Sequence, residues 1–310
     1  MIHKSSFIKN LILVVFISLL SLETSAQQDP QYTQYMYNTM SVNGAYAGQR
    51  GVLSATALYR TQWVGIDGAP KTVTFGIHTP LRNDRIGLGL NIVSDQLGPA
   101  KETSIDANVA YTIPLDERDE LKLSFGIKAG LHILDTDWSK GLFQNADRVF
   151  NENINLISPT IGVAWYLHSE KYYLGLSVPN AIATSHYDDF QESIATERVH
   201  YYVIGGYVFD LSGNTKLKPA FLVKGVSGAP LIADLSVNAL FNDKFTLGLA
   251  YRWDDSISGL LGFQINPGLF IGYAYDLTTT GLNNYNSGSH EVMLRFELQE
   301  IGRLISPRFF

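Results

Sequence analysis

The stretch LKLSFGIKAGLHI (residues 121–133) alternates strictly between two kinds of side chain. Its odd-numbered positions carry Leu, Leu, Phe, Ile, Ala, Leu and Ile, and its even-numbered positions carry Lys, Ser, Gly, Lys, Gly and His. Because successive side chains of a β-strand point to opposite faces, this pattern predicts a strand with one apolar and one polar face. We expect Phe125 and Ile127 to face lipid and Lys128 to face the interior of a barrel.

The same alternation recurs in about fourteen segments, each with roughly the 9–11 residues that a tilted membrane strand needs. This pattern predicts an all-β fold, a transmembrane outer-membrane β-barrel of about 14 antiparallel strands. A soluble β-sandwich also alternates and stays the alternative on alternation alone. The strands are expected to begin near Val52, Lys71, Arg85, Lys101, Glu120, Ile157, Lys171, Thr196, Lys216, Pro230, Lys244, Ser256, Gly268 and Ser287.

The lengths of the connections favour the barrel. Every second connection is short and rich in turn residues, as in TPLRND, LDERDE, HSEK, LSGNTK, FNDK and NPG. Long connections fall on the opposite side of the sheet, at residues 136–156, 180–195 and 277–286. Outer-membrane barrels have short periplasmic turns and longer outer loops, whereas a sandwich has no reason to sort its loops by side. We therefore expect the first two long loops outside the cell, and the turns at 82–84 and 242–243 in the periplasm.

The N-terminus has the features of a secretory signal. Two lysines precede an apolar run at residues 11–22, which is too short to span a bilayer comfortably, and small residues before Gln27 offer a cleavage site. An uncleaved anchor helix is the alternative. The predicted organisation is a signal peptide at residues 1–26, a periplasmic or plug segment at 27–51, a barrel at 52–298 and a C-terminal tail at 299–310.

Composition narrows the classes of function. The chain has no Cys, which excludes a disulfide framework and a thiolate metal site. Its formal net charge is -6, which argues against a nucleic-acid partner because such proteins need a basic face. Aromatic residues make up 12% of the chain, a content common in outer-membrane barrels with aromatic girdles.

The sequence offers no motif for catalysis, for a cofactor or for a metal ion. His290 and Glu291 begin like a zinc-protease motif, but the second His four residues on is missing. Gly87 and Gly89 lack the third glycine of a dinucleotide site. We therefore predict that the protein is not an enzyme, and we expect no cofactor.

Charged residues fall on the polar face of the predicted strands. A charge that points to lipid near mid-depth costs about 2–4 kcal/mol, so these residues should face the lumen. One interpretation is a generic, solvated lumen. The other is a mixed-charge interior that holds a plug or a passing polypeptide. The residues concerned are Arg60, Lys122, Lys128, Lys218, Lys224, Asp234, Arg252 and Arg295.

Several stretches, taken in order, resemble the PorP/SprF family of outer-membrane proteins of the type IX secretion system. The chain departs from the family's usual Asn-Pro-Ala-Tyr-Ala-Gly by carrying Gly44 in place of Pro, which loosens the backbone there. The matching blocks are QYTQYMYNTMSVNGAYAG (31–48), YRTQWVGIDGAPKTVTFGIHTPL (59–81), SDQLGP (94–99), YYLGLSVPN (172–180), GYAYDL (272–277), GSHEVMLRF (288–296) and the tail ISPRFF (305–310).

The resemblance implies a non-enzymatic, integral outer-membrane protein needed for secretion or surface attachment of a cognate adhesin of the gliding type. The implied partners are the C-terminal domain of that secreted adhesin, periplasmic peptidoglycan-associated secretion components, and outer-membrane lipid. A barrel that transports small apolar or polar solutes is the alternative function.

Two groups of residues are candidates for binding. The aromatic segment at residues 31–48 is expected to fold into the lumen or against its periplasmic mouth, although an extended periplasmic leader is the alternative. Its plug candidates are Tyr35, Tyr37 and Tyr46. The candidates for partner binding at the outer strand ends are Asp67, Asp254 and Asp255, with Trp63 and Trp253, whose strand phase also fits a lipid-facing aromatic girdle.

Overall fold

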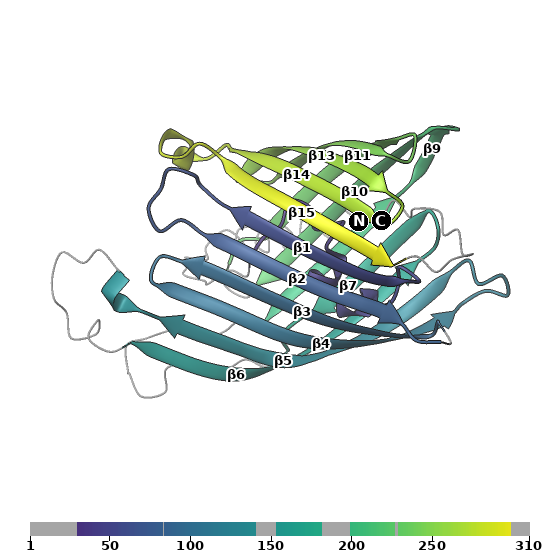
Figure 1. The fold of residues 1–310 in the computed structure, drawn as a ribbon, viewed down its shortest axis with the longest axis horizontal. Helices are drawn as coiled ribbons and strands as arrows, with labels where there is room; N and C mark the ends of the chain where they lie inside the picture. The colour runs from purple at the N-terminus through teal and green to yellow at the C-terminus, as the bar shows by residue number, and fades with distance from the viewer. Residues whose placement is uncertain (1–29, 83, 141–152, 182–198, 227–228, 299–310) are drawn as a thin grey trace, which may run out of the picture.

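The computed structural model describes residues 30–82, 84–140, 153–181, 199–226 and 229–298, and shows β-strands wound into a closed barrel (Figure 1). The predicted signal peptide, the C-terminal tail and most of the two longest loops lie outside the described residues. The strands are β1 (Leu53–Thr61), β2 (Lys71–Pro80), β3 (Ile86–Leu97), β4 (Ala100–Pro114), β5 (Lys122–Thr136), β6 (Ile154–His168), β7 (Tyr172–Val178), β8 (His200–Tyr207), β9 (Phe209–Ser212), β10 (Thr215–Val226), β11 (Ile232–Phe241), β12 (Phe245–Arg252), β13 (Ser256–Asn266), β14 (Leu269–Thr278) and β15 (Ser289–Leu298).

Antiparallel pairing runs around the whole wall and closes between the first strand and the last. β1 pairs with β15 from Leu53 opposite Leu298 to Thr61 opposite His290. β8 and β9 both pair with β10 and are interrupted only at Val208, whose N–H donates to the Lys171 carbonyl oxygen. They form one crossing, so the fifteen strand segments make 14 crossings, as the sequence predicts.

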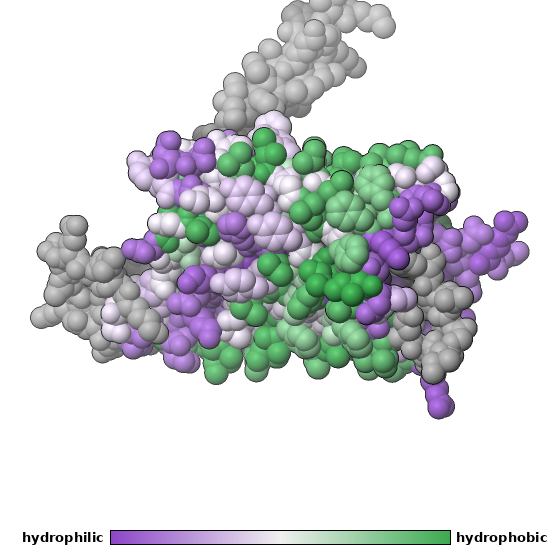
Figure 2. All heavy atoms as spheres, turned by 45° about the horizontal axis from the view of Figure 1, so that its top comes forward, coloured by the Kyte–Doolittle hydropathy of each residue, from purple (hydrophilic) through white to green (hydrophobic). Residues whose placement is uncertain are grey.

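The wall shows the predicted alternation between outside and inside. On β5, Phe125 and Ile127 face outward, with Ile127 61% exposed, whereas Ser124 is buried and Lys128 is half-buried in the lumen. Figure 2 shows apolar residues spread over the outer surface of the strands. Closure explains why this chain tolerates so many exposed apolar side chains, because a barrel leaves no free edge and turns its apolar face to lipid.

The two ends of the barrel differ. The turn end holds the first residue of β1, the last residue of β15 and only short connections, such as those at residues 81–85 and 242–244. The loop end holds the connections at residues 62–70 and 279–288, the described residues 137–140 and 179–181, and short turns at 98–99 and 253–255. It also holds two short 3-10 helices, η2 (Trp138–Lys140) and η4 (Gly281–Asn284). The connections of the loop end contact one another, since Gly98 N–H donates to the Gly68 carbonyl oxygen at 2.8 Å. No helix in the described part of the chain is long and apolar enough to cross a membrane.

Candidate functional site

The lumen holds the N-terminal segment of the chain, residues 30–51, here called the plug. Figure 1 shows it in dark purple within the ring of strands. It contains the short helix α2 (Thr39–Val42) and the 3-10 helix η1 (Gly44–Tyr46). Most of its residues are buried against the wall, so the segment is a folded part of the barrel interior rather than an extended leader.

At the loop end, a cluster of charged wall residues forms hydrogen bonds with the first turn of the plug. Arg60 on β1 forms ion pairs with Asp276 on β14 (2.6 Å) and with Glu291 on β15 (3.2 Å). The Glu291 carboxylate accepts backbone N–H groups from Thr33 (3.0 Å) and Gln34 (2.8 Å). The Thr33 hydroxyl donates to Asp276 at 2.8 Å. The wall therefore binds the plug main chain through a fully buried carboxylate.

Arg252 on β12 extends this cluster. Its Nε donates to Asp234 on β11 at 2.7 Å, and its Nη2 donates to the carbonyl oxygen of Tyr32 at 3.3 Å. We call Arg60, Asp234, Arg252, Asp276 and Glu291 the mouth cluster. Its charges are almost completely buried, and buried charges are costly unless they are paired and hydrogen-bonded. The plug supplies part of that pairing.

Aromatic side chains of the plug pack against the lumen wall. Tyr37 packs against Phe270 with ring centroids 5.4 Å apart, and the Lys218 ammonium lies 4.8 Å from the centre of the Tyr37 ring. Tyr46 meets Tyr166 of β6 edge-on at 5.5 Å. Tyr35 is buried as well, and burial raises the pKa of both the Tyr35 and the Tyr37 hydroxyl above the usual range. These side chains therefore stay neutral, and their rings contribute apolar packing inside the lumen.

Glycines of the wall let the plug backbone lie directly against strands β3 and β5. A Cβ atom built on Gly126 would overlap the backbone of Gly44 and Ala45. A Cβ on Gly87 would overlap the carbonyl of Ala47. Glycine is required wherever another backbone approaches this closely, so this side of the lumen is shaped to the plug.

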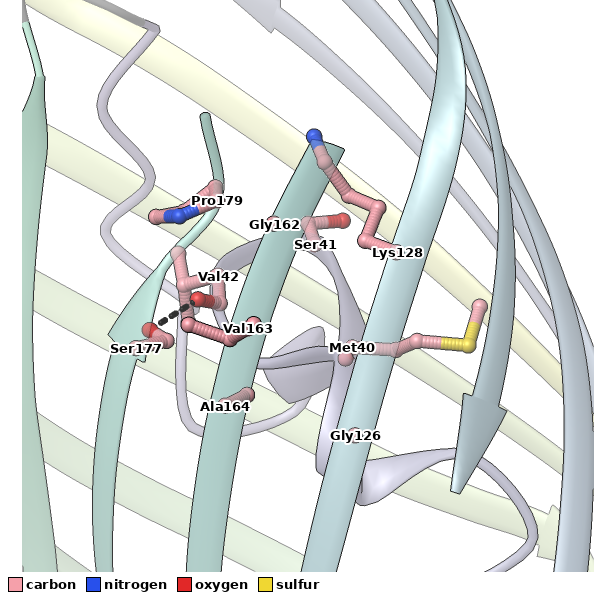
Figure 3. A pocket seen from close by; sticks show the side chains of 11 residues that line it. Met40, Ser41, Val42, Gly126, Lys128, Gly162, Val163, Ala164, Ser177 and Pro179 are labelled. Atoms are coloured by element: carbon pink, nitrogen blue, oxygen red, sulfur yellow. Dashed lines mark hydrogen bonds between the residues drawn. The ribbon is translucent and has the colours of Figure 1, made fainter. Parts of the chain in front are cut away.

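Strands β6 and β7 hold the plug by hydrogen bonds to its turn between α2 and η1. Asn43 Nδ2 donates to the carbonyl oxygens of Trp165 (3.0 Å) and Leu176 (3.3 Å). The Ser177 hydroxyl donates to the carbonyl oxygen of Val42 at 2.5 Å, as drawn in Figure 3. The Asn43 side chain also accepts the N–H of Ala45 and so caps η1.

Little free space separates plug and wall at this place. The pocket in Figure 3 lies between α2 and strands β5, β6 and β7, with Lys128 and Pro179 on two of its sides. Its volume is about 10 Å³, roughly the room for one water molecule. The Lys128 ammonium pairs with Asp106 of β4 at 3.1 Å.

The candidates for partner binding all lie at the loop end. Asp67 and Asp254 are exposed, and Trp253 is 68% exposed in phase with the outward face of β12. Asp255 is half-exposed and pairs with Arg252 of the mouth cluster at 3.3 Å. Strand alternation does not determine the direction of the Trp63 side chain. β1 ends at Thr61, and Trp63 takes a left-handed conformation with φ of 47°.

Sequence reasoning did not single out the acidic residues that hold the plug. In the sequence, Glu291 belongs to an incomplete zinc-protease motif, and Asp276 belongs to no catalytic or metal-binding motif. Both lie at inward-facing strand positions, which was the available signal for a lumen role. Among the residues that the structure describes, no three His, Asp or Glu side chains come together as a possible metal site.

Comparison with known proteins identifies one family. A family model described as "Type IX secretion system membrane protein PorP/SprF" matches residues 24–296. No curated protein matches the sequence. Solved barrels are similar to the chain: Omp33 of Acinetobacter baumannii (9% identity, TM-score 0.47, 80% of this chain and 100% of that chain) and a FadL homologue of Pseudomonas aeruginosa (12%, 0.43, 80% and 89%). The CymD monoaromatic hydrocarbon channel is 9% identical, with TM-score 0.46 over 85% of this chain and 93% of that chain.

Proposed function

The chain belongs to the PorP/SprF family of type IX secretion system membrane proteins, and from this premise we propose that it is a non-enzymatic adaptor for one secreted adhesin. It sits in the outer membrane as an integral barrel. In this proposal the loop end receives the C-terminal domain of the adhesin, of the gliding type, and supports its secretion or attachment at the surface. The turn end faces periplasmic, peptidoglycan-associated secretion components.

The observation that carries the proposal is the occupied lumen. An open channel for polar solutes needs a continuous water-filled path, whereas this wall is built around its own N-terminal segment. Charges bind the main chain of the plug at Thr33 and Gln34, and glycines receive its backbone at Ala45 and Ala47. A barrel committed to holding a plug is suited to docking other proteins at its ends.

The loop end offers acidic side chains for docking. Asp67 and Asp254 are exposed and are separate from the mouth cluster, whereas Asp255 contacts Arg252 and would disturb the cluster if changed. The clean test is therefore the double variant Asp67→Asn, Asp254→Asn. Asn tolerates the left-handed conformation of Asp254, with φ of 57°, so the loop should keep its shape.

This double variant should leave barrel levels in the membrane unchanged and reduce surface display of the cognate adhesin, measured with an antibody on whole cells. Asp243→Asn is the matched control, because Asp243 is also exposed and left-handed, with φ of 51°, but lies at the turn end. Normal display in the double variant would exclude these two loops as a main contact. A pull-down from outer membranes that recovers no secreted protein, together with solute uptake into reconstituted vesicles, would favour the transporter instead.

A further inference from the structure

The shortest crossing of the wall is β7, with seven residues. Six residues of β7 pair with β6, and six pair with β8. By contrast, β5 pairs with each of its two neighbours over 15 residues. We call the pairing between β6 and β7 the short seam. Because each backbone hydrogen bond adds only a modest net stabilisation, the short seam is held less firmly by its own ladder than the seams of β5.

Pro179 fixes the loop-end limit of the short seam. The last pair of residues in register is Val163 opposite Val178. Pro has no N–H group and cannot continue a ladder, so β7 stops before it. Just beyond, the Ala181 N–H donates to the carbonyl oxygen of Ile161 at 2.7 Å. The ladder of the short seam therefore cannot extend further along β7 than Val178.

Asn43 of the plug bridges the short seam from inside the lumen. Its Nδ2 atom donates to the carbonyl oxygen of Trp165 on β6 at 3.0 Å and to that of Leu176 on β7 at 3.3 Å. These two wall residues lie opposite each other in register. One amide nitrogen carries two hydrogens, so a single side chain binds both strands of the seam at once. Asn43 is buried, which keeps water from competing for these bonds.

The wall is shaped to admit this bridge. A Cβ atom built on Gly175 of β7 would lie 2.7 Å from Nδ2 of Asn43, so glycine leaves the room that the amide needs. The Ser177 hydroxyl of β7 donates to the carbonyl oxygen of Val42 at 2.5 Å, beside Pro179 (Figure 3). The plug therefore contacts the shortest strand through two neighbouring residues, Val42 and Asn43.

A second side-chain amide of the plug bridges a long seam and offers a comparison. Gln49 Nε2 donates to the hydroxyl of Thr112 on β4 and to that of Ser124 on β5, both at 2.9 Å. Thr112 and Ser124 also lie opposite each other in register. Because β4 and β5 pair over 15 residues, we expect the Gln49 bridge to add little to the cohesion of that seam.

We propose that the plug holds the short seam closed. Asn43 ties β6 to β7, and Val42 ties β7 to the plug, so movement of the plug away from β7 opens the wall between β6 and β7 first. The plug thus stabilises one place in the wall in addition to occupying the lumen. The proposal concerns contacts within the chain, so it stands whether or not the adhesin proposal is right.

Asn43→Ser tests the bridge. Ser keeps an oxygen that can accept the Ala45 N–H and cap η1, but it is too short to reach both wall carbonyls. Hydrogen exchange of the full-length barrel in lipid nanodiscs is measured by mass spectrometry, after heat-modifiable mobility has shown that the barrel is folded. Exchange at residues 172–178 should rise about tenfold, the factor expected for the loss of two hydrogen bonds of ordinary net strength. Exchange in β13, elsewhere in the wall, should not change.

Ser177→Ala tests the same strand from the wall side and leaves Asn43 in place. It removes one hydrogen bond to the plug, so exchange at residues 172–178 should rise about threefold. Gln49→Ser is the matched control on the long seam, and exchange in β5 should stay as in the natural chain.

Three results would overturn the proposal. In Asn43→Ser, faster exchange at residues 43–47 with β7 unchanged would make Asn43 an anchor of the plug only, and an equal rise in β7 and β13 would mean that the whole wall had loosened. A rise in β5 in Gln49→Ser as large as that in β7 would show that the length of the seam does not matter. If Asn43→Ser did not fold, Ser177→Ala would decide, and unchanged exchange in β7 would overturn the proposal there.

Discussion

The two halves of the plug differ in how the wall meets their main chain. At the loop end, the wall presents buried charges, and Glu291 accepts main-chain N–H groups while Arg60 and Asp276 complete the pairing. Towards the turn end, the wall presents glycines, and the backbone at Ala45 and Ala47 lies directly on strands β5 and β3. The same half is also held by an ion pair between Arg50 and Glu297 at 2.6 Å.

The difference has a physical consequence. A buried ion cluster binds strongly only while every member keeps its partner, so the loss of one group disrupts the whole contact. Close packing on glycine depends on shape alone and is insensitive to charge. The main-chain contacts at Thr33 and Gln34 should therefore be sensitive to the loss of one wall charge, whereas those at Ala45 and Ala47 should not.

The largest effect is expected from Glu291→Gln. This change leaves Arg60 with Asp276 as its remaining carboxylate and weakens the hold on two plug N–H groups. Loss of one member of a buried ion pair costs about 3–5 kcal/mol, and we expect about 3 because Asp276 stays in place. Hydrogen exchange measured by mass spectrometry should rise first at residues 32–34.

Asp210→Asn is the control for that variant. It breaks the Lys171–Asp210 pair (3.1 Å), which is more than half exposed at the turn end, and exposed pairs contribute about 0–1 kcal/mol. Plug exchange should not change in this control. If Glu291→Gln left residues 32–34 as protected as in the natural chain, the mouth cluster would not be what holds the loop-end half.

Gly126→Ala should have a smaller effect, centred on the other half. The added Cβ would overlap the backbone of Ala45, and overpacking typically costs about 1–3 kcal/mol. Exchange should rise at residues 43–47 before it rises at 32–34. Gly259→Ala on β13 is the control, since it faces outward with open space around it. An equal rise of exchange at both sets of residues in Gly126→Ala would show that the plug opens as one unit. That result would contradict the proposed difference between the two halves.

The sequence alone predicted the barrel and a plug or mouth-lining segment at residues 31–48, but not the contacts that hold the plug. Alternation depends on neighbours along one strand, so the facing of Phe125, Ile127 and Lys128 could be predicted from their own segment. The contact between Thr33 and Glu291 joins residues 258 apart in sequence and has no periodic signal. The direction of the Trp63 side chain could not be predicted from alternation either, because the chain has left β1 for a left-handed turn at that residue.

The smallest effect is expected from Gly44→Pro, which tests the departure from the family pattern. Gly44 is the first residue of η1, a position that suits Pro, and Asn43 before it is extended (φ -140°, ψ 103°). A Cβ there would lie 2.6 Å from Oδ1 of Asn108, a flexible side chain that can move. We expect a gain of about 0.4–1 kcal/mol from the restricted unfolded chain, seen as slower exchange at residues 43–47.

Gly281→Pro is its control, as the first residue of η4 with open space around it at the loop end. It should leave exchange in the plug unchanged. Faster exchange at residues 43–47 in Gly44→Pro would mean that Asn108 cannot move aside and that Gly44 is needed for close packing.

Ion conductance of the reconstituted barrel tests most directly the central claim that the lumen is filled by the N-terminal segment. The natural chain and a variant without residues 27–50 are compared in planar bilayers, after heat-modifiable mobility has shown that both barrels are folded. We predict that the natural chain stays closed and that the shortened chain conducts. Equal, open conductance in both proteins would contradict the claim and would make this barrel a channel.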